Sequence, residues 1–103
     1  MRLSFIKITD NNDCRNYYID VTRMADVRIR VGILYSRYSR GYKQEVLDNI
    51  FKGDWSFCCV KKVYADDYSK VKEYKNDLYR FYDAKLVNYK KPTFSNIITF
   101  SSL

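Results

Sequence analysis

The chain of 103 residues is 47% hydrophobic and 30% charged, and its 19 Lys and Arg against 12 Asp and Glu give a formal net charge of +7. These proportions indicate one compact globular domain. The absence of any run near the roughly 18 to 20 apolar residues that a membrane span requires excludes a span, and because the N-terminus alternates apolar and polar residues we expect no signal peptide. We therefore expect an intracellular protein with no membrane partner, and the excess of positive charge favours a polyanionic partner such as nucleic acid.

The first predicted elements form a β-hairpin. Apolar and β-prone residues alternate over residues 3–9, a polar turn follows at residues 10–13, and residues 15–21 read as a returning strand. Because alternate side chains of a strand point to opposite faces, Tyr17 and Tyr18 should lie on different sides of the sheet.

Two helices are predicted next. Thr22 can cap a helix whose apolar residues recur every three or four positions, while Arg23, Arg30 and Arg37 fall largely outside this stripe. The stripe consists of Met24, Val27, Val31, Leu34 and Tyr38. Gly41 interrupts the pattern, and residues 44–52 show a second helical period that Gly53 ends.

A third strand is predicted over residues 55–63. Its continuous apolar run contains Cys58 and Cys59 and suggests a central strand buried on both faces. We expect both cysteines to pack as small hydrophobic residues. With Cys14 as the third cysteine, no histidine and no Cys-x-x-Cys pair, the chain predicts neither a disulfide framework nor an ordinary zinc site.

A third helix is predicted over residues 70–86, with Asp67 or Ser69 as its cap. One side would carry the apolar and long side chains Val71, Tyr74, Leu78, Phe81 and Lys85. Glu73, Asp77 and Arg80 would lie together beside that stripe.

The predicted order is therefore β-β-α-α-β-α, which indicates the α+β class with a three-stranded antiparallel sheet flanked by helices. A single domain would span residues 1–92. The tail, residues 93–103, contains a β-prone stretch for which two roles are open: an added strand, or the association of two copies into a homodimer.

Several ordered motifs resemble the GIY-YIG endonuclease superfamily, particularly its small viral copies. Members often read Ile-Tyr-Lys-Ile-Thr-Asn in strand one and Tyr-Ile-Gly-Ser-Thr in strand two, where this chain has Phe5-Ile6-Lys7-Ile8-Thr9-Asp10 and Tyr18-Ile19-Asp20-Val21-Thr22. Arg28 follows Tyr18 by the usual ten residues, and Asp54-Trp55 and Val87-Asn88-Tyr89-Lys90-Lys91-Pro92 also echo the family. The resemblance covers roughly residues 5–92.

The resemblance implies metal-dependent hydrolysis of a phosphodiester by an endonuclease. It assigns the second-strand phenol to Tyr18, the phosphate-facing guanidinium to Arg28 and the supporting polar residue to Asn88. Asp77 takes the place of the glutamate on the third helix and would hold Mg²⁺ or Mn²⁺, with Glu73 as the alternative if the register differs by one turn.

Three departures from the family pattern predict that hydrolysis is weakened or lost. Ile6 stands where the first tyrosine, the favoured general base, is expected, and an aliphatic side chain cannot accept a proton. Asp20 replaces the second-motif glycine and would repel phosphate by like charge. Gly32 stands where a histidine or tyrosine often follows the arginine.

Two functional hypotheses follow. The first is a weakened endonuclease that uses Mg²⁺ or Mn²⁺, and the second is a catalytically inactive, nuclease-derived module that binds nucleic acid or a protein partner. In both, Arg23, Arg30, Arg37 and Lys90 are the candidate nucleic-acid contacts, joined around the first helix by Arg28 and Arg40. DNA is favoured over RNA, and low sequence specificity is expected because the short domain has no attached recognition module.

Overall fold

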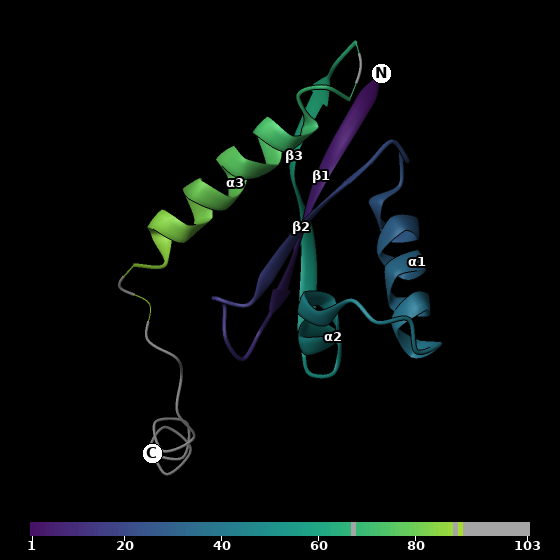
Figure 1. Cartoon of the computed structure of the whole chain (residues 1–103), viewed down its shortest axis with the longest axis vertical. Coiled ribbons are helices and arrows are strands. Elements are labelled where there is room, and N and C mark those ends of the chain that lie inside the picture. The colour runs from purple at the N-terminus through teal and green to yellow at the C-terminus, as the bar shows by residue number, and fades with distance from the viewer. Residues whose placement is uncertain (67, 88, 90–103) are drawn as a thin grey trace, which may run out of the picture.

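The computed structural model describes residues 1–66, 68–87 and 89. Three strands and three helices follow one another in the predicted order (Figure 1). They are β1 (Arg2–Asp10), β2 (Tyr17–Thr22), α1 (Val27–Ser39), α2 (Glu45–Phe51), β3 (Trp55–Tyr64) and α3 (Val71–Lys85). The α+β class with a three-stranded antiparallel sheet is confirmed.

The strand order is β2-β1-β3, so β1 is the central strand and pairs antiparallel with both neighbours. The prediction that the third strand is central and buried on both faces was wrong, because β3 pairs along one edge only and both Cys58 and Cys59 are exposed. The strand buried on both faces is β1, whose Leu3 and Phe5 face one cluster and whose Ile6 and Ile8 face the other.

The two faces of the sheet carry separate hydrophobic clusters. Ile6 and Ile8 pack with residues of α1 and α2, while Leu3, Phe5 and Tyr17 pack with residues of α3. Figure 1 shows α1 and α3 at opposite sides of the sheet. Tyr18 packs against the first cluster and Tyr17 belongs to the second, so the predicted separation of these tyrosines is confirmed.

The start of α1 and the last part of the apolar stripe of α3 differ from prediction. Thr22 ends β2, and α1 begins only at Val27 because the side chain of Asp26 accepts a hydrogen bond from the Arg28 amide and caps the helix. On α3, Phe81 is exposed, while Tyr82 and Leu86 pack beneath the helix instead.

The predictions for Asn88, Lys90 and the tail of residues 93–103 lie outside the residues that the structure describes. Within the part of the chain that the structure describes, no helix combines the length and the apolar character that crossing a membrane requires.

Candidate nucleic-acid interface

Tyr18 projects from the edge strand β2 toward the side of the sheet that α1 and α2 cover. Its hydroxyl accepts a hydrogen bond of 3.1 Å from Nε2 of Gln44, which directly precedes α2. The Nζ atom of Lys75, on α3, lies 5.9 Å from the centre of the Tyr18 ring. Tyr18 therefore joins three elements that are far apart in the sequence.

The surroundings of Tyr18 keep its phenol protonated. Burial raises the pKa of the hydroxyl most, and the negative charge of Asp20 raises it further, against the hydrogen bond from Gln44 and the charge of Arg30. A raised pKa disfavours the phenolate, the form that could take a proton from water. Tyr18 is thus better suited to packing and hydrogen bonding than to the proton-accepting part of hydrolysis.

Asp20 is paired rather than exposed to a ligand. It is only 5% exposed, and its carboxylate accepts hydrogen bonds of 2.7 Å and 3.3 Å from Nε and Nη2 of Arg30 on α1. The ion pair offsets the negative charge that was expected to repel phosphate. It also engages Arg30, one of the predicted nucleic-acid contacts, in an internal interaction.

Arg28, the arginine that the resemblance places on phosphate, lies on another face of α1. Its side chain is 77% exposed, and its Nε and Nη2 donate to the carboxylate of Asp26. This carboxylate raises the pKa of the Arg28 guanidinium. Among the described contacts near Tyr18, the arginine charge comes from Arg30, not from Arg28.

The predicted metal ligand Asp77 is an exposed residue of α3 that is paired with Arg80. Its side chain is 55% exposed, and the carboxylate lies 3.8 Å from Nη1 of Arg80. Glu73, the alternative ligand, is exposed as well. In residues 1–66, 68–87 and 89, no group of three or more Asp, Glu, Cys or His side chains is arranged to hold a metal ion.

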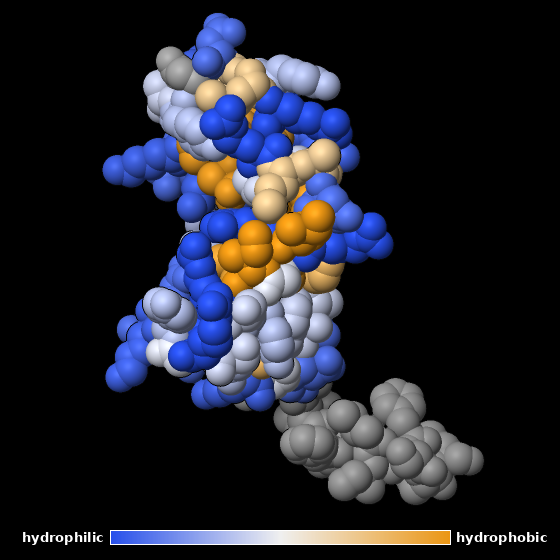
Figure 2. All heavy atoms as spheres, turned by 90° about the vertical axis from the view of Figure 1, so that its right-hand side faces the viewer, coloured by the Kyte–Doolittle hydropathy of each residue, from blue (hydrophilic) through white to orange (hydrophobic). Residues whose placement is uncertain are grey.

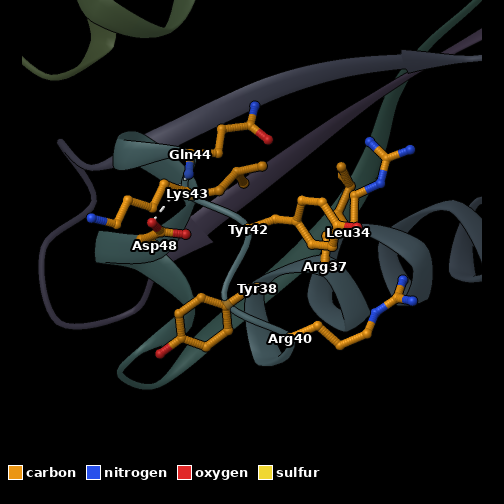
Figure 3. A pocket seen from close by; sticks show the side chains of 9 residues that line it. Leu34, Arg37, Tyr38, Arg40, Tyr42, Lys43, Gln44 and Asp48 are labelled. Atoms are coloured by element: carbon orange, nitrogen blue, oxygen red, sulfur yellow. Dashed lines mark hydrogen bonds between the residues drawn. The ribbon is translucent and has the colours of Figure 1, made fainter.

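A pocket of about 520 Å³ opens where α1 ends and the chain turns toward α2 (Figure 3). We call it the α1/α2 pocket. Three cationic side chains line it, together with two tyrosines and Gln44: Arg37, Arg40, Lys43, Tyr38 and Tyr42. None of the described carboxylates lies within ion-pair distance of these three cations.

The end of α1 explains how the pocket forms. Gly41 has a φ of +87°, and its amide donates to the Tyr38 carbonyl while the Tyr42 amide donates to that of Arg37. This is the Schellman arrangement, which ends a helix sharply and needs a residue that tolerates positive φ. The reversal brings the Tyr42 ring back beside Leu34 and Arg37 of α1, while Lys43 extends toward Asp48 on the other side of the pocket (Figure 3).

One carboxylate, that of Asp48 on α2, also lines the α1/α2 pocket. Its Oδ2 accepts a hydrogen bond from the Gln44 amide at 3.1 Å, as the dashed line in Figure 3 shows. Its Oδ1 is covered and accepts no hydrogen bond from the described residues. The three cations outnumber this single negative charge, so the pocket is positive.

A second pocket, of about 560 Å³, lies along the first turns of α3 and is called the α3 pocket. Lys72 and Lys75 line it with Tyr68 and Tyr79. Arg23, from the segment between β2 and α1, places its guanidinium carbon 5.9 Å from the Tyr68 ring centre. Both pockets therefore combine cations with tyrosine rings.

The predicted nucleic-acid contacts are thus divided. Arg37 lines the α1/α2 pocket, Arg23 lies beside the α3 pocket, and Arg30 is held by Asp20. Tyr42, Lys43, Lys72 and Lys75 were missed. The Gly41-Tyr42-Lys43 sequence after a helix was the available signal, whereas nothing local in the sequence indicates that Lys75 lies near Tyr18.

In comparisons with known proteins, no protein-family model, no curated protein and no solved structure matches this chain.

Proposed function

We propose that this domain binds nucleic acid through contacts with the phosphate backbone and does so without strong sequence preference. One observation carries the proposal. The cations Arg37, Arg40 and Lys43 gather around one pocket without described carboxylate partners, whereas Arg28 and Arg30 are each paired with an aspartate. Unpaired cations that share a concave surface with tyrosines suit a polyanion with stackable bases.

Low sequence specificity is supported by the outer face of α1. A helix that reads bases in the major groove presents polar side chains to the base edges. The exposed side of α1 carries Ile29, which is 54% exposed, beside Arg28, whose guanidinium is paired with Asp26, and Figure 2 shows an apolar area in the middle of the side on which α1 lies. Binding that depends mainly on phosphate contacts carries little sequence information.

The endonuclease implied by the resemblance, with Mg²⁺ or Mn²⁺ held by Asp77, stays a prediction. The geometry favours it less, because Asp77 is paired with Arg80 and the Tyr18 phenol holds its proton. Incubation of supercoiled plasmid with Mg²⁺, Mn²⁺ or chelator distinguishes the two hypotheses. Metal-dependent nicking that Asp77→Ala abolishes would establish the enzyme, while binding without nicking supports the proposed module.

The binding site is tested by comparing two variants with the same net charge. The first, Arg37→Ala/Arg40→Ala/Lys43→Ala, removes the pocket cations. The second, Arg2→Ala/Lys62→Ala/Lys85→Ala, removes three exposed cations that line neither pocket. Each variant falls from +7 to +4, because three positive charges are lost.

Fluorescence anisotropy with a labelled oligonucleotide of about 20 nucleotides, at salt concentrations from about 50 to 200 mM, provides the measurement. We expect the pocket variant to bind at least about tenfold more weakly, with a salt slope smaller by about 2, since each phosphate contact on a single strand contributes about 0.7. The control variant should lose less affinity than the pocket variant. Equal losses in both variants would show that net charge alone, and not this pocket, determines binding.

A further inference from the structure

We infer that the nucleic acid bound by this domain is single-stranded, and that its bases stack along a track from Tyr42 past Tyr18 to Tyr68. The inference rests on the proposed function and deepens it by naming the substrate class. It starts from the contacts between the two pockets. Gln44 lines the α1/α2 pocket and donates to Tyr18, and Lys75 lies over the Tyr18 ring and lines the α3 pocket.

Each tyrosine along this track has a cation near its ring. The guanidinium carbon of Arg40 lies 5.8 Å from the Tyr42 ring centre. The corresponding distances are 5.9 Å from Lys75 to Tyr18 and 5.9 Å from Arg23 to Tyr68. A ring that stacks on a base, with a cation within reach of the adjacent phosphate, is the arrangement by which proteins hold single strands.

The two end tyrosines are accessible for such stacking. Tyr42 is 64% exposed and Tyr68 is 47% exposed, so each ring offers surface that the fold does not use. Tyr18 is half-buried and fixed by Gln44, which makes it the linking residue of the track rather than an open platform.

A duplex fits this surface poorly. Its bases are already stacked inside the helix, so exposed tyrosine rings gain no base contact without unpairing the strands. The phosphates of a duplex would still attract the pocket cations, but only a single strand can use the cations and the rings together. The geometry therefore predicts a preference for single strands that depends on aromatic rings.

The test compares a single-stranded oligonucleotide with a duplex of the same length, as DNA and as RNA, for wild type and four variants. Tyr42→Ala and Tyr68→Ala each remove one end platform. Tyr64→Ala is the matched control, because Tyr64 is the most exposed of these tyrosines, at 83%, and lines neither the α1/α2 pocket nor the α3 pocket. Tyr42→Phe keeps the ring and should bind as wild type does.

We expect Tyr42→Ala and Tyr68→Ala to weaken single-strand binding by about fivefold to about 150-fold each, since one base stack contributes about 1 to 3 kcal/mol. Duplex binding and the salt slope should change little. Wild type should also gain affinity between oligonucleotides of about 4 and about 12 nucleotides, and Tyr68→Ala should lose that gain.

Three results would overturn the inference: equal affinity for single strands and duplex, equal losses on both substrates in the tyrosine variants, or an effect of Tyr64→Ala as large as theirs. Each of these leaves nucleic-acid binding through the cations intact. Absence of binding to every substrate would overturn the proposed function itself, so the two failures are distinguishable.

Discussion

Asp20 on β2 and Arg30 on α1 form an ion pair with two hydrogen bonds, and the pair is largely removed from solvent. The exposed fractions of the two side chains are 7% and 25%. The resemblance aligns Asp20 with the glycine of the second GIY-YIG motif and predicts that its charge repels phosphate, but Arg30 supplies the counter-charge. This pair ties the first helix to the edge strand beside Tyr18.

The ion pair should contribute to stability mainly by preventing an unpaired buried charge. Arg30→Met leaves the Asp20 carboxylate without a partner, and we expect the free energy of unfolding to fall by about 2 to 3 kcal/mol, less than for a fully buried pair because Arg30 keeps some solvent contact. Adding Asp20→Asn should recover part of the loss. Urea unfolding followed by circular dichroism measures both changes.

The exposed pair of Arg28 and Asp26 provides the control for this prediction. Arg28→Met removes an ion pair of similar length, yet its partner Asp26 keeps its hydrogen bond to the helix amide and its access to water. The unfolding midpoint should therefore stay close to that of wild type. A loss as large as that of Arg30→Met would show that burial is not what distinguishes the pairs.

The two glycines around α1 should respond to alanine with opposite signs. At Gly32, inside the helix, an added Cβ meets nothing within 4 Å, so Gly32→Ala should stabilise the fold by about 0.5 to 1 kcal/mol through helix propensity. At Gly41 space is equally open, but φ is +87°, and Gly41→Ala should cost about 1 kcal/mol. Thermal unfolding of both variants measures the direction of each change in stability. A change in the same direction for both variants would contradict the prediction.

Stability should fall at alkaline pH because several tyrosines resist ionisation in the folded chain. Burial raises the pKa values of Tyr17, Tyr18, Tyr79 and Tyr82. The unfolded chain releases its phenolic protons at a pH of about 10, while the folded chain still retains them, so stability is complete below that pH and is lost as the pH rises beyond it.

Urea unfolding at a series of pH values, with phenolate absorbance recorded in parallel, measures this effect. Tyr17 carries the largest shift and also donates to the Asp83 carboxylate, so Tyr17→Phe should flatten the alkaline decline most. Tyr42→Phe, at an exposed site, is the control and should leave it unchanged. An alkaline decline that Tyr17→Phe does not alter would contradict the assignment to buried phenols.

The element order could be predicted from the sequence because each element has a local signal. The hairpin alternates, Gly41 and Gly53 follow helical patterns, and Tyr17 and Tyr18 necessarily face opposite sides. The central position of β1 could not be predicted from such signals. The apolar run of β3 is compatible with a buried or an edge strand, and only the pairing with β1 decides between them.

The arginine beside Tyr18 could not be predicted for a related reason. The family interval counts residues from Tyr18 to Arg28, but α1 starts at Val27, and residues two apart on a helix point about 200° apart. The late start therefore turns Arg30 toward the sheet and Arg28 toward solvent. The link between the two pockets depends on contacts of Tyr18 with Gln44, 26 residues away, and with Lys75, which periodicity does not reveal.

Asp48 offers the sharpest local test of the positive pocket, since its carboxylate lies among the cations proposed to bind phosphate. Asp48→Asn keeps an oxygen that can accept from the Gln44 amide while removing one negative charge and the covered carboxylate oxygen that has no described partner. We expect affinity for a single strand to rise by about twofold to fivefold, because a like charge near phosphate costs about 1 kcal/mol or less at a solvated surface.

The control is Asn49→Asp, which adds a negative charge at the exposed neighbouring position. It should lower the affinity by a smaller factor than the one by which Asp48→Asn raises it. If Asp48→Asn weakens binding instead, the carboxylate accepts a hydrogen bond from the ligand, and the α1/α2 pocket holds a base rather than a phosphate.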